Sequence, residues 1–238
     1  MTSKSTPDEI RARFDQDVER FSNLASGQSA TVDAPLSLEL IAQAAALTNP
    51  EATHLLDIGC GAGNYTLKVL ERLPRLSISL VDLSRPMLER AKDRIAQVTS
   101  NPVTCWQSDI RDLELETERY DLILAAAVLH HLRDENEWEQ VFHKIYRSLK
   151  PGGSFWVSDL VEHSLPQVQA FMWERYGRYL SELKDDTYRD QVFDYIRKED
   201  TPRPLIFQLN LLRRSGFQQV EVLHKNNCFA AFGAVKGR

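Results

Sequence analysis

The chain contains little cysteine and no long apolar segment. Its 238 residues include three cysteines, an odd number, at Cys60, Cys105 and Cys228. No two of them have zinc-ligand spacing, so we expect three reduced thiols and no metal site. The first residues lack the apolar core of a signal peptide, and no uncharged segment is long enough to cross a membrane. These absences predict a cytoplasmic protein without a membrane partner.

An excess of basic residues is also missing. The net charge of −5 gives no support for a dedicated nucleic-acid surface, so nucleic acid is not the expected partner. No repeat, low-complexity tract or linker divides the chain, and its length suits one α/β domain with a full core. We therefore predict a single domain over residues 1–238, with an N-terminal helical cap at 1–48 and a helical insertion at 161–216.

The hydrophobic pattern predicts strands that alternate with helices in the middle of the chain. Expected strands are 53–58, 76–81, 103–107, 120–127 and 153–159, and expected helices are 64–73, 85–98 and 135–149. Residues 1–7 are expected to be disordered, and further helices are expected at 8–24, 35–47, 168–183, 187–198 and 205–215. Helical crossovers between strands indicate a mostly parallel sheet with helices on both faces. The last two apolar runs, 218–224 and 228–235, predict an antiparallel hairpin.

A glycine-rich turn links the first of these strands to a helix, within Leu55–Thr66. Gly59, Gly61 and Gly63 stand at alternate positions, where they permit positive φ and let a ligand approach the backbone. The unpaired N–H groups at the start of the helix suit a ligand that carries a carboxylate or phosphate. The third glycine follows the second by two residues and not three, which argues weakly against a nicotinamide cofactor.

Carboxylates end the next two strands. Asp82 lies where an acid can accept hydrogen bonds from both hydroxyls of a ribose. The alternative is a helix cap, although Ser84 and Pro86 would already serve that purpose. Asp109 can accept from an adenine amino group, while a neighbouring backbone N–H meets a ring nitrogen. Strand ends on one edge of an open sheet converge, so these groups are expected around one ligand.

Five motifs together resemble the class I S-adenosylmethionine-dependent methyltransferases. They are Asp57–Gly63, Val81–Ser84 with Met87, Leu88 and Ala91, Ser108–Ile110, Val128–Leu132 and Leu149–Gly153. The resemblance covers about residues 50–160 and the closing hairpin. It implies a seven-stranded, mostly parallel, Rossmann-like sheet with helices on both faces, an antiparallel last strand and a helical insertion after the fifth strand.

The resemblance also implies the cofactor S-adenosylmethionine, with S-adenosylhomocysteine as product, and a role for each motif residue. The turn Gly59, Gly61 and Gly63 packs against the methionine part, and Asp57 orients its amino group. Asp82 holds the ribose, Leu83 and Met87 line the adenine face, and Asp109 and Ile110 bind the adenine edge. Ala126 and Ala127 supply backbone beside the reactive centre.

Methyl transfer from a sulfonium is an in-line displacement with a neutral leaving group, so it requires no general acid. A base is needed only if the acceptor must lose a proton, and His131 is the better candidate of the pair His130–His131. Either histidine can instead cap a helix or bond the backbone. We expect a small-molecule acceptor between the insertion and the N-terminal helix, but no residue set there specifies one chemical group. The aromatic residues of the insertion either enclose the acceptor or form a core or a dimer contact.

Three alternatives stay open. The layout around Leu211–Phe217 and the final strand loosely resembles the carboxy-S-adenosylmethionine synthases, which modify the cofactor itself. A non-catalytic protein that binds S-adenosylmethionine and a nicotinamide oxidoreductase are the others. The chain is expected to be a monomer or a homodimer that associates through the insertion.

Overall fold

A seven-stranded sheet organises the chain in the computed structural model, which describes residues 4–23 and 27–238. The strands run in the order β3-β2-β1-β4-β5-β7-β6. All neighbouring strands are parallel except at β7, which is antiparallel to both β5 and β6. The predicted Rossmann-like sheet with an antiparallel last strand is therefore confirmed.

The elements follow the predicted alternation closely. The strands are β1 (His54–Ile58), β2 (Ser77–Asp82), β3 (Val103–Gln107), β4 (Tyr120–Ala126), β5 (Leu149–Leu160), β6 (Gln219–Asn226) and β7 (Phe229–Val235). The helices are α1 (Pro7–Gln16), α2 (Val18–Ser22), α4 (Ala34–Thr48), α5 (Asn64–Leu70), α6 (Arg85–Ala96), η1 (Leu129–His131), α7 (Glu135–Ser148), α8 (Pro166–Leu183), α9 (Asp186–Glu199) and α10 (Leu205–Ser215). β5 begins earlier than predicted because Leu149 already pairs with Tyr120 of β4.

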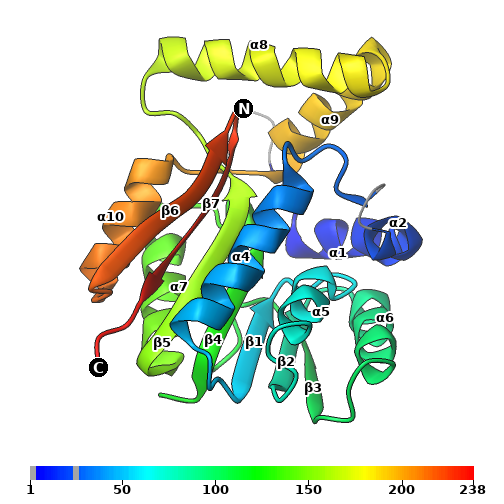
Figure 1. The fold of residues 1–238 in the computed structure, drawn as a ribbon. Helices are drawn as coiled ribbons and strands as arrows, with labels where there is room; N and C mark the ends of the chain where they lie inside the picture. Colours follow the sequence, from blue (N-terminus) through cyan, green and yellow to red (C-terminus); the bar gives the residue numbers. More distant parts are fainter. Residues whose placement is uncertain (1–3, 24–26) are drawn as a thin grey trace.

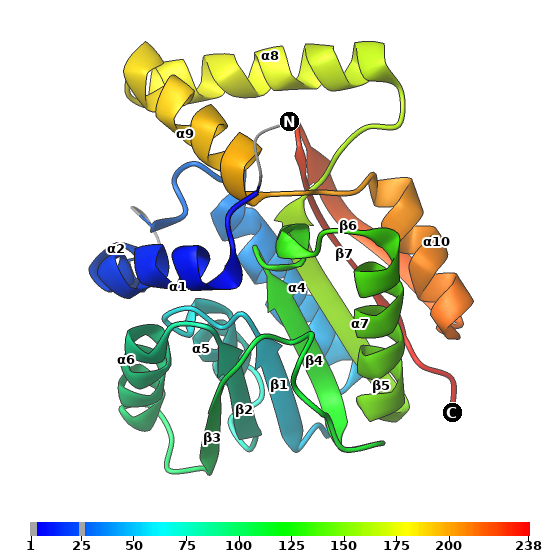
Figure 2. The same ribbon diagram turned by 180° about the vertical axis from the view of Figure 1, so that it is seen from behind.

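Helices cover both faces of the sheet because the central strands are apolar on both sides. On one face, α7 and α10 bury Trp138, Phe142 and Leu211 against β4 and β5. On the other face, α4, α5 and α6 bury side chains such as Ile41 and Val69. Figures 1 and 2 show these two layers from opposite sides. This arrangement leaves the carboxyl ends of β1, β2 and β4 free to bear a site.

The N-terminal cap differs from its prediction in two ways. The expected helix 8–24 is interrupted at Asp17, which ends α1 and precedes α2, and residue 24 lies outside the described residues. The prediction of disorder over 1–7 is wrong for residues 4–7, since Thr6 and Glu9 form a reciprocal capping box at the start of α1. Residues 1–3 lie outside the described part of the chain.

Helices α8 and α9 of the insertion and helices α1 and α2 of the cap lie over the carboxyl edge of the sheet (Figures 1 and 2). Figures 1 and 2 place α8 and α9 above the strand ends, with α1 and α2 beside them. Tyr176 and Leu180 of α8 and Ile196 of α9 form a small core of their own with Leu160 and Cys228. Within the described residues, no helix has the length and apolar character that crossing a membrane requires.

Candidate active site

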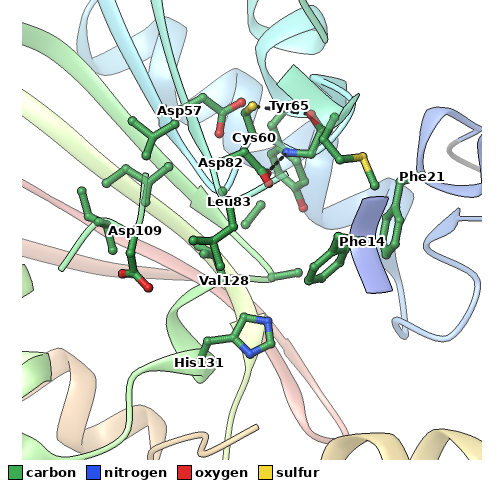
Figure 3. A pocket seen from close by; sticks show the side chains of 18 of the residues that line it. Phe14, Phe21, Asp57, Cys60, Tyr65, Asp82, Leu83, Asp109, Val128 and His131 are labelled. Carbon is green, nitrogen blue, oxygen red and sulfur yellow. Dashed lines mark hydrogen bonds between the residues drawn. The ribbon is translucent and has the colours of Figure 1, made fainter. Parts of the chain in front are cut away.

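A first cavity of about 1000 Å³ opens at the carboxyl ends of β1, β2 and β4. Every residue that the sequence assigns to a ligand site lines it except Gly63: Asp57, Gly59, Gly61, Asp82, Leu83, Met87, Asp109, Ile110, Ala126, Ala127 and His131. Figure 3 shows Asp109 at one end of this cavity and Phe14 and Phe21 of the cap at the other. Sequence reasoning missed these two phenylalanines, because nothing in their helical pattern says which face covers a ligand.

The glycines of the turn have different surroundings. All three have positive φ, at +65° for Gly59, +49° for Gly61 and +82° for Gly63. A Cβ on Gly59 would lie 2.5 Å from a methyl of Val128, whereas a Cβ on Gly61 would meet nothing within 4 Å. Gly63 is the N-cap of α5, and its Cβ would lie 3.2 Å from Ala91 of α6. Gly61 therefore faces open space in the first cavity, while Gly63 allows two helices to pack.

Asp82 joins the glycine turn to the end of β2. Its Oδ2 accepts from the N–H of Gly61 at 2.8 Å, and its Oδ1 accepts from the N–H of Ser84 at 2.8 Å. Burial raises the pKa of Asp82 to about 6, although these backbone hydrogen bonds oppose that rise. The side chain of Ser84, not that of Asp82, caps α6. The structure thus removes the helix cap as the explanation for Asp82.

Asp57 is a buried carboxyl behind the turn. Thr66 Oγ1, in the first turn of α5, donates to its Oδ2 at 2.7 Å. Burial raises the pKa of Asp57 to about 7, and the hydrogen bond from Thr66 opposes the rise. The role of Thr66 could not be predicted from the sequence, because this contact depends on how α5 packs on β1.

Asp109 has a partner that the sequence analysis did not name. Arg111 Nε and Nη2 donate to its two carboxylate oxygens at 3.0 and 2.7 Å, and Arg111 Nη1 also reaches Glu137 at 3.0 Å. Burial would raise the pKa of Asp109, but the hydrogen bonds and charge of Arg111 hold it below the ordinary value. Asp109 therefore stays ionised, with part of its accepting capacity already used.

A second cavity of about 1450 Å³ adjoins the first. Six residues line both of them: Phe14, Phe21, Gln28, Tyr65, Ala126 and Ala127. The insertion contributes Tyr176, Tyr188 and Tyr195 to its wall, and β7 contributes Phe229. Tyr176 belongs to the core of the insertion, as one of the two interpretations of these aromatic residues predicted, and it also lines this cavity.

His130, His131, Asp159 and Asp200 form a cluster between the two cavities. The ring Nδ1 of His130 hydrogen-bonds Asp159 Oδ1, and its Nε2 lies 3.6 Å from Asp200 Oδ1. The same Asp200 oxygen lies 3.4 Å from His131 Nδ1. His131 lines the first cavity, whereas His130, Asp159 and Asp200 line the second. The loop that follows α9 thereby places a carboxylate against the turn that follows β4.

The two histidines of the cluster have opposite charge states. Burial would lower the pKa of His130, but the charges of Asp159 and Asp200 raise it to about 9. Burial and the charge of His130 together hold the pKa of His131 well below its ordinary value. At neutral pH His130 is therefore an imidazolium, and His131 is a neutral imidazole.

One potential ligand set for a metal ion exists among the described residues. His130, His131 and Asp200 each offer one atom, and these atoms lie within 4.8 Å of one another. Because the His130 ring is protonated between two carboxylates, neither of its nitrogens has a lone pair to offer a metal ion.

Comparisons with known proteins identify the family. A family model described as a methyltransferase domain matches residues 56–155. A carboxy-S-adenosyl-L-methionine synthase of Shewanella loihica is 30% identical over 194 residues, which are 77% of this chain and 76% of that protein. The chain belongs to the S-adenosylmethionine-dependent methyltransferases.

Further relatives of this methyltransferase vary in length. A malonyl-[acyl-carrier protein] O-methyltransferase of Priestia megaterium is 34% identical over 137 residues, 57% of this chain but 47% of that protein. The chain thus spans about half the length of that curated relative. The structure of a Burkholderia thailandensis 1,6-didemethyltoxoflavin-N1-methyltransferase with S-adenosylhomocysteine shares the fold, with a TM-score of 0.63, 17% identity and coverage of 100% of this chain and 93% of the other. The family replaces the nicotinamide oxidoreductase and the non-catalytic protein as explanations.

The first cavity of the methyltransferase suits its cofactor, S-adenosylmethionine. The open space beside Gly61 is the space that a Cβ would fill, so the turn leaves room for a ligand against its backbone. Asp82 and Asp109 supply acceptors for hydroxyl and amino groups at the adjoining strand ends.

Proposed function

We propose that the enzyme transfers the methyl group of S-adenosylmethionine to a small molecule that binds in the second cavity. The observation that carries this proposal is the wall that the two cavities share at Tyr65, Ala126 and Ala127. When bound, S-adenosylmethionine supplies a methyl group on a positively charged sulfonium sulfur. After transfer of the methyl group, the rest of the cofactor is a neutral thioether, S-adenosylhomocysteine. A shared wall allows donor and acceptor to be held close, in line and away from water, which supplies much of the rate.

In this proposal, different residues of the first cavity bind different parts of the cofactor. Asp82 accepts from the ribose hydroxyls, and Asp57 faces the amino group, whose positive charge would favour the ionised carboxylate. Asp109 and Ile110 hold the adenine edge, while Leu83 and Met87 cover its face. Gly59, Gly61 and Ala126 provide close backbone, and Gly63 contributes indirectly by allowing α5 to pack on α6.

His131 is the proposed base for an acceptor that must lose a proton. Its imidazole is neutral, and its polar neighbours are the backbone of Glu199 and the carboxylate of Asp200. A proton taken up at His131 would be stabilised by Asp200, 3.4 Å from Nδ1. His130 is already protonated, so its proposed role is to hold Asp159 and Asp200 in place.

Labelling with S-adenosyl-[methyl-³H]methionine tests the proposal. Purified enzyme is incubated with the dialysable, RNA and protein fractions of a cell extract, and each fraction is counted. We expect label to enter the dialysable fraction. Label confined to RNA or protein would contradict a small-molecule acceptor.

A carboxy-S-adenosylmethionine synthase is the second candidate, favoured by the similarity to the Shewanella loihica protein over three quarters of its length. Against it, the described arginines that line the two cavities are paired and none remains for an added carboxylate. Arg111 pairs with Asp109, Arg13 with Glu199 at 3.0 Å, and Arg20 with Asp17 at 2.6 Å. Mass spectrometry of the cofactor that copurifies with the protein separates the two candidates. A carboxylated mass would overturn the methyltransferase proposal.

The cytoplasmic location, the single domain and the association state stay predictions. Light scattering on the purified enzyme distinguishes a monomer from a homodimer formed through residues 161–216.

A further inference from the structure

Asp200, which lines the second cavity, has a carboxylate oxygen that accepts no hydrogen bond within the described residues. The Asp200 side chain is only 2% exposed, and its Oδ1 makes no hydrogen bond within the described part of the chain. Buried polar atoms nearly always have a partner, so an unpartnered carboxylate oxygen is costly. The amide oxygen of Gln28, which lines both cavities, is unpartnered as well. Both atoms accept hydrogen bonds, so the missing group is a donor.

The charges around this cavity also favour a cation. Arg13 and Arg20 are the basic side chains of its described wall, and each is held by acidic partners. Four carboxylates lie in or beside this wall: Asp17, Asp159, Glu199 and Asp200. Lys4 and Arg133 also lie near Asp200, but neither lines the cavity. An anionic acceptor would therefore meet carboxylates with no free arginine in the described wall, whereas an ammonium group would find carboxylates to pair with.

Aromatic rings enclose the same space from three directions. Phe14 and Phe21 come from the cap, Tyr188 and Tyr195 from the insertion, and Phe229 from β7. Rings in this number favour a flat apolar ligand and also attract a cation through their faces.

We propose that the acceptor is an arylalkylamine, an aromatic ring with an amino group on an alkyl chain, whose ammonium group donates hydrogen bonds to Asp200. This inference rests on the proposed function, because it assigns the second cavity to the acceptor. Asp200 would then be the specificity residue of the cavity. An acceptor with a carboxylate in place of the amine would be excluded.

Matched ligands test the preference by calorimetry on protein saturated with S-adenosylhomocysteine. The probes are tryptamine and indole-3-acetate, which share the ring and differ in the sign of the charge. We expect tryptamine to bind at least about tenfold more tightly. Asp200→Asn should remove this preference, and Asp200→Glu, which retains the charge, should restore most of it. Asp190→Asn is the control, since Asp190 lies on the exposed face of α9 and pairs with Arg189.

Each failure has a distinct meaning. If S-adenosylhomocysteine itself does not bind, the proposed function fails before any amine is added. If S-adenosylhomocysteine binds but indole-3-acetate binds as tightly as tryptamine, or neither probe binds, the inference about the acceptor is wrong. It is also wrong if a folded Asp200→Asn variant, verified by its thermal melt, retains the preference.

Discussion

Replacement of Asp159 by Asn should destabilise the enzyme more than any other single change of a carboxylate to an amide near the site. Asp159 is the penultimate residue of β5, and its side chain is fully buried. Its Oδ2 accepts from the backbone N–H groups of Leu129 and His130 at 2.9 and 3.2 Å. Its Oδ1 accepts from the N–H of Leu160 at 2.7 Å and from the His130 ring. One carboxylate therefore fixes the turn after β4 to the end of β5.

Asparagine retains one of these oxygens and replaces the other with an NH₂ group that faces N–H donors. The variant leaves buried donors unpaired and removes the counter-charge of the His130 imidazolium. Breaking a buried charge pair from one side costs about 3–5 kcal/mol. Urea unfolding followed by circular dichroism measures this loss, which should appear as a lower midpoint at an unchanged slope.

Asp17→Asn provides the comparison, because Asp17 is a partly exposed ion-pair partner of Arg20. Its loss should cost less than about 1 kcal/mol. If Asp159→Asn costs no more than this control, the network we describe around Asp159 does not stabilise the fold.

The ion pair between His130 and Asp159 predicts that the stability of the enzyme depends on pH. The pKa of His130 rises from 6.5 in the unfolded chain to about 9 in the folded enzyme, so the folded state holds this proton more tightly. Its contribution to the free energy of unfolding is fully present below pH 6.5 and is lost as the pH rises through 9. At 1.36 kcal/mol per pKa unit, the loss amounts to about 3 kcal/mol. Asp159→Asn should flatten this profile, and a flat profile for the unsubstituted enzyme would refute the charge state of His130.

Three further predictions concern the cofactor and the base. Gly61→Ala should weaken S-adenosylhomocysteine binding at least about tenfold in calorimetry, since its Cβ projects into the first cavity, whereas Gly63→Ala should mainly lower the melting temperature. Asp82→Asn should weaken the same binding about 10- to 100-fold through lost ribose hydrogen bonds, and an unchanged Kd would exclude Asp82 from the ribose site. His131→Asn should leave that Kd unchanged but slow methyl transfer at least about 100-fold, and an equal rate would exclude His131 as the base.

The sheet and its crossovers could be predicted from the sequence because the central strands are apolar on both faces. An apolar run such as Leu122–Ala126 is stable only where both faces of the strand are buried, which is the middle of a sheet covered by helices on both sides. The break at Asp17 could not be predicted, because α1 and α2 continue one apolar periodicity on both sides of it. Its position depends on what the cap covers, which is a tertiary property.

The part of the first cavity that the sheet edge forms could be predicted because its groups stand at strand ends, where topology alone brings them together. Asp57, Asp82 and Asp109 needed only the strand order to converge. Gly63 differs because its neighbour Ala91 belongs to another helix. The ion pair between Arg111 and Asp109 could not be predicted either, since closeness in sequence does not fix the direction of a side chain.

The second cavity, unlike the strand ends of the first, is formed by segments that only the tertiary structure brings together. Asp159 and Asp200 are brought to His130 by β5 and by the loop after α9, and no local motif records that meeting. Six residues line both cavities, so most of the wall of the second cavity can change without altering the first. The motifs therefore identify S-adenosylmethionine, while the second cavity, which we propose binds the acceptor, is lined by segments that meet only in the folded enzyme. Substitutions at Asp200 should accordingly change which acceptor binds and leave the affinity for S-adenosylhomocysteine unaltered.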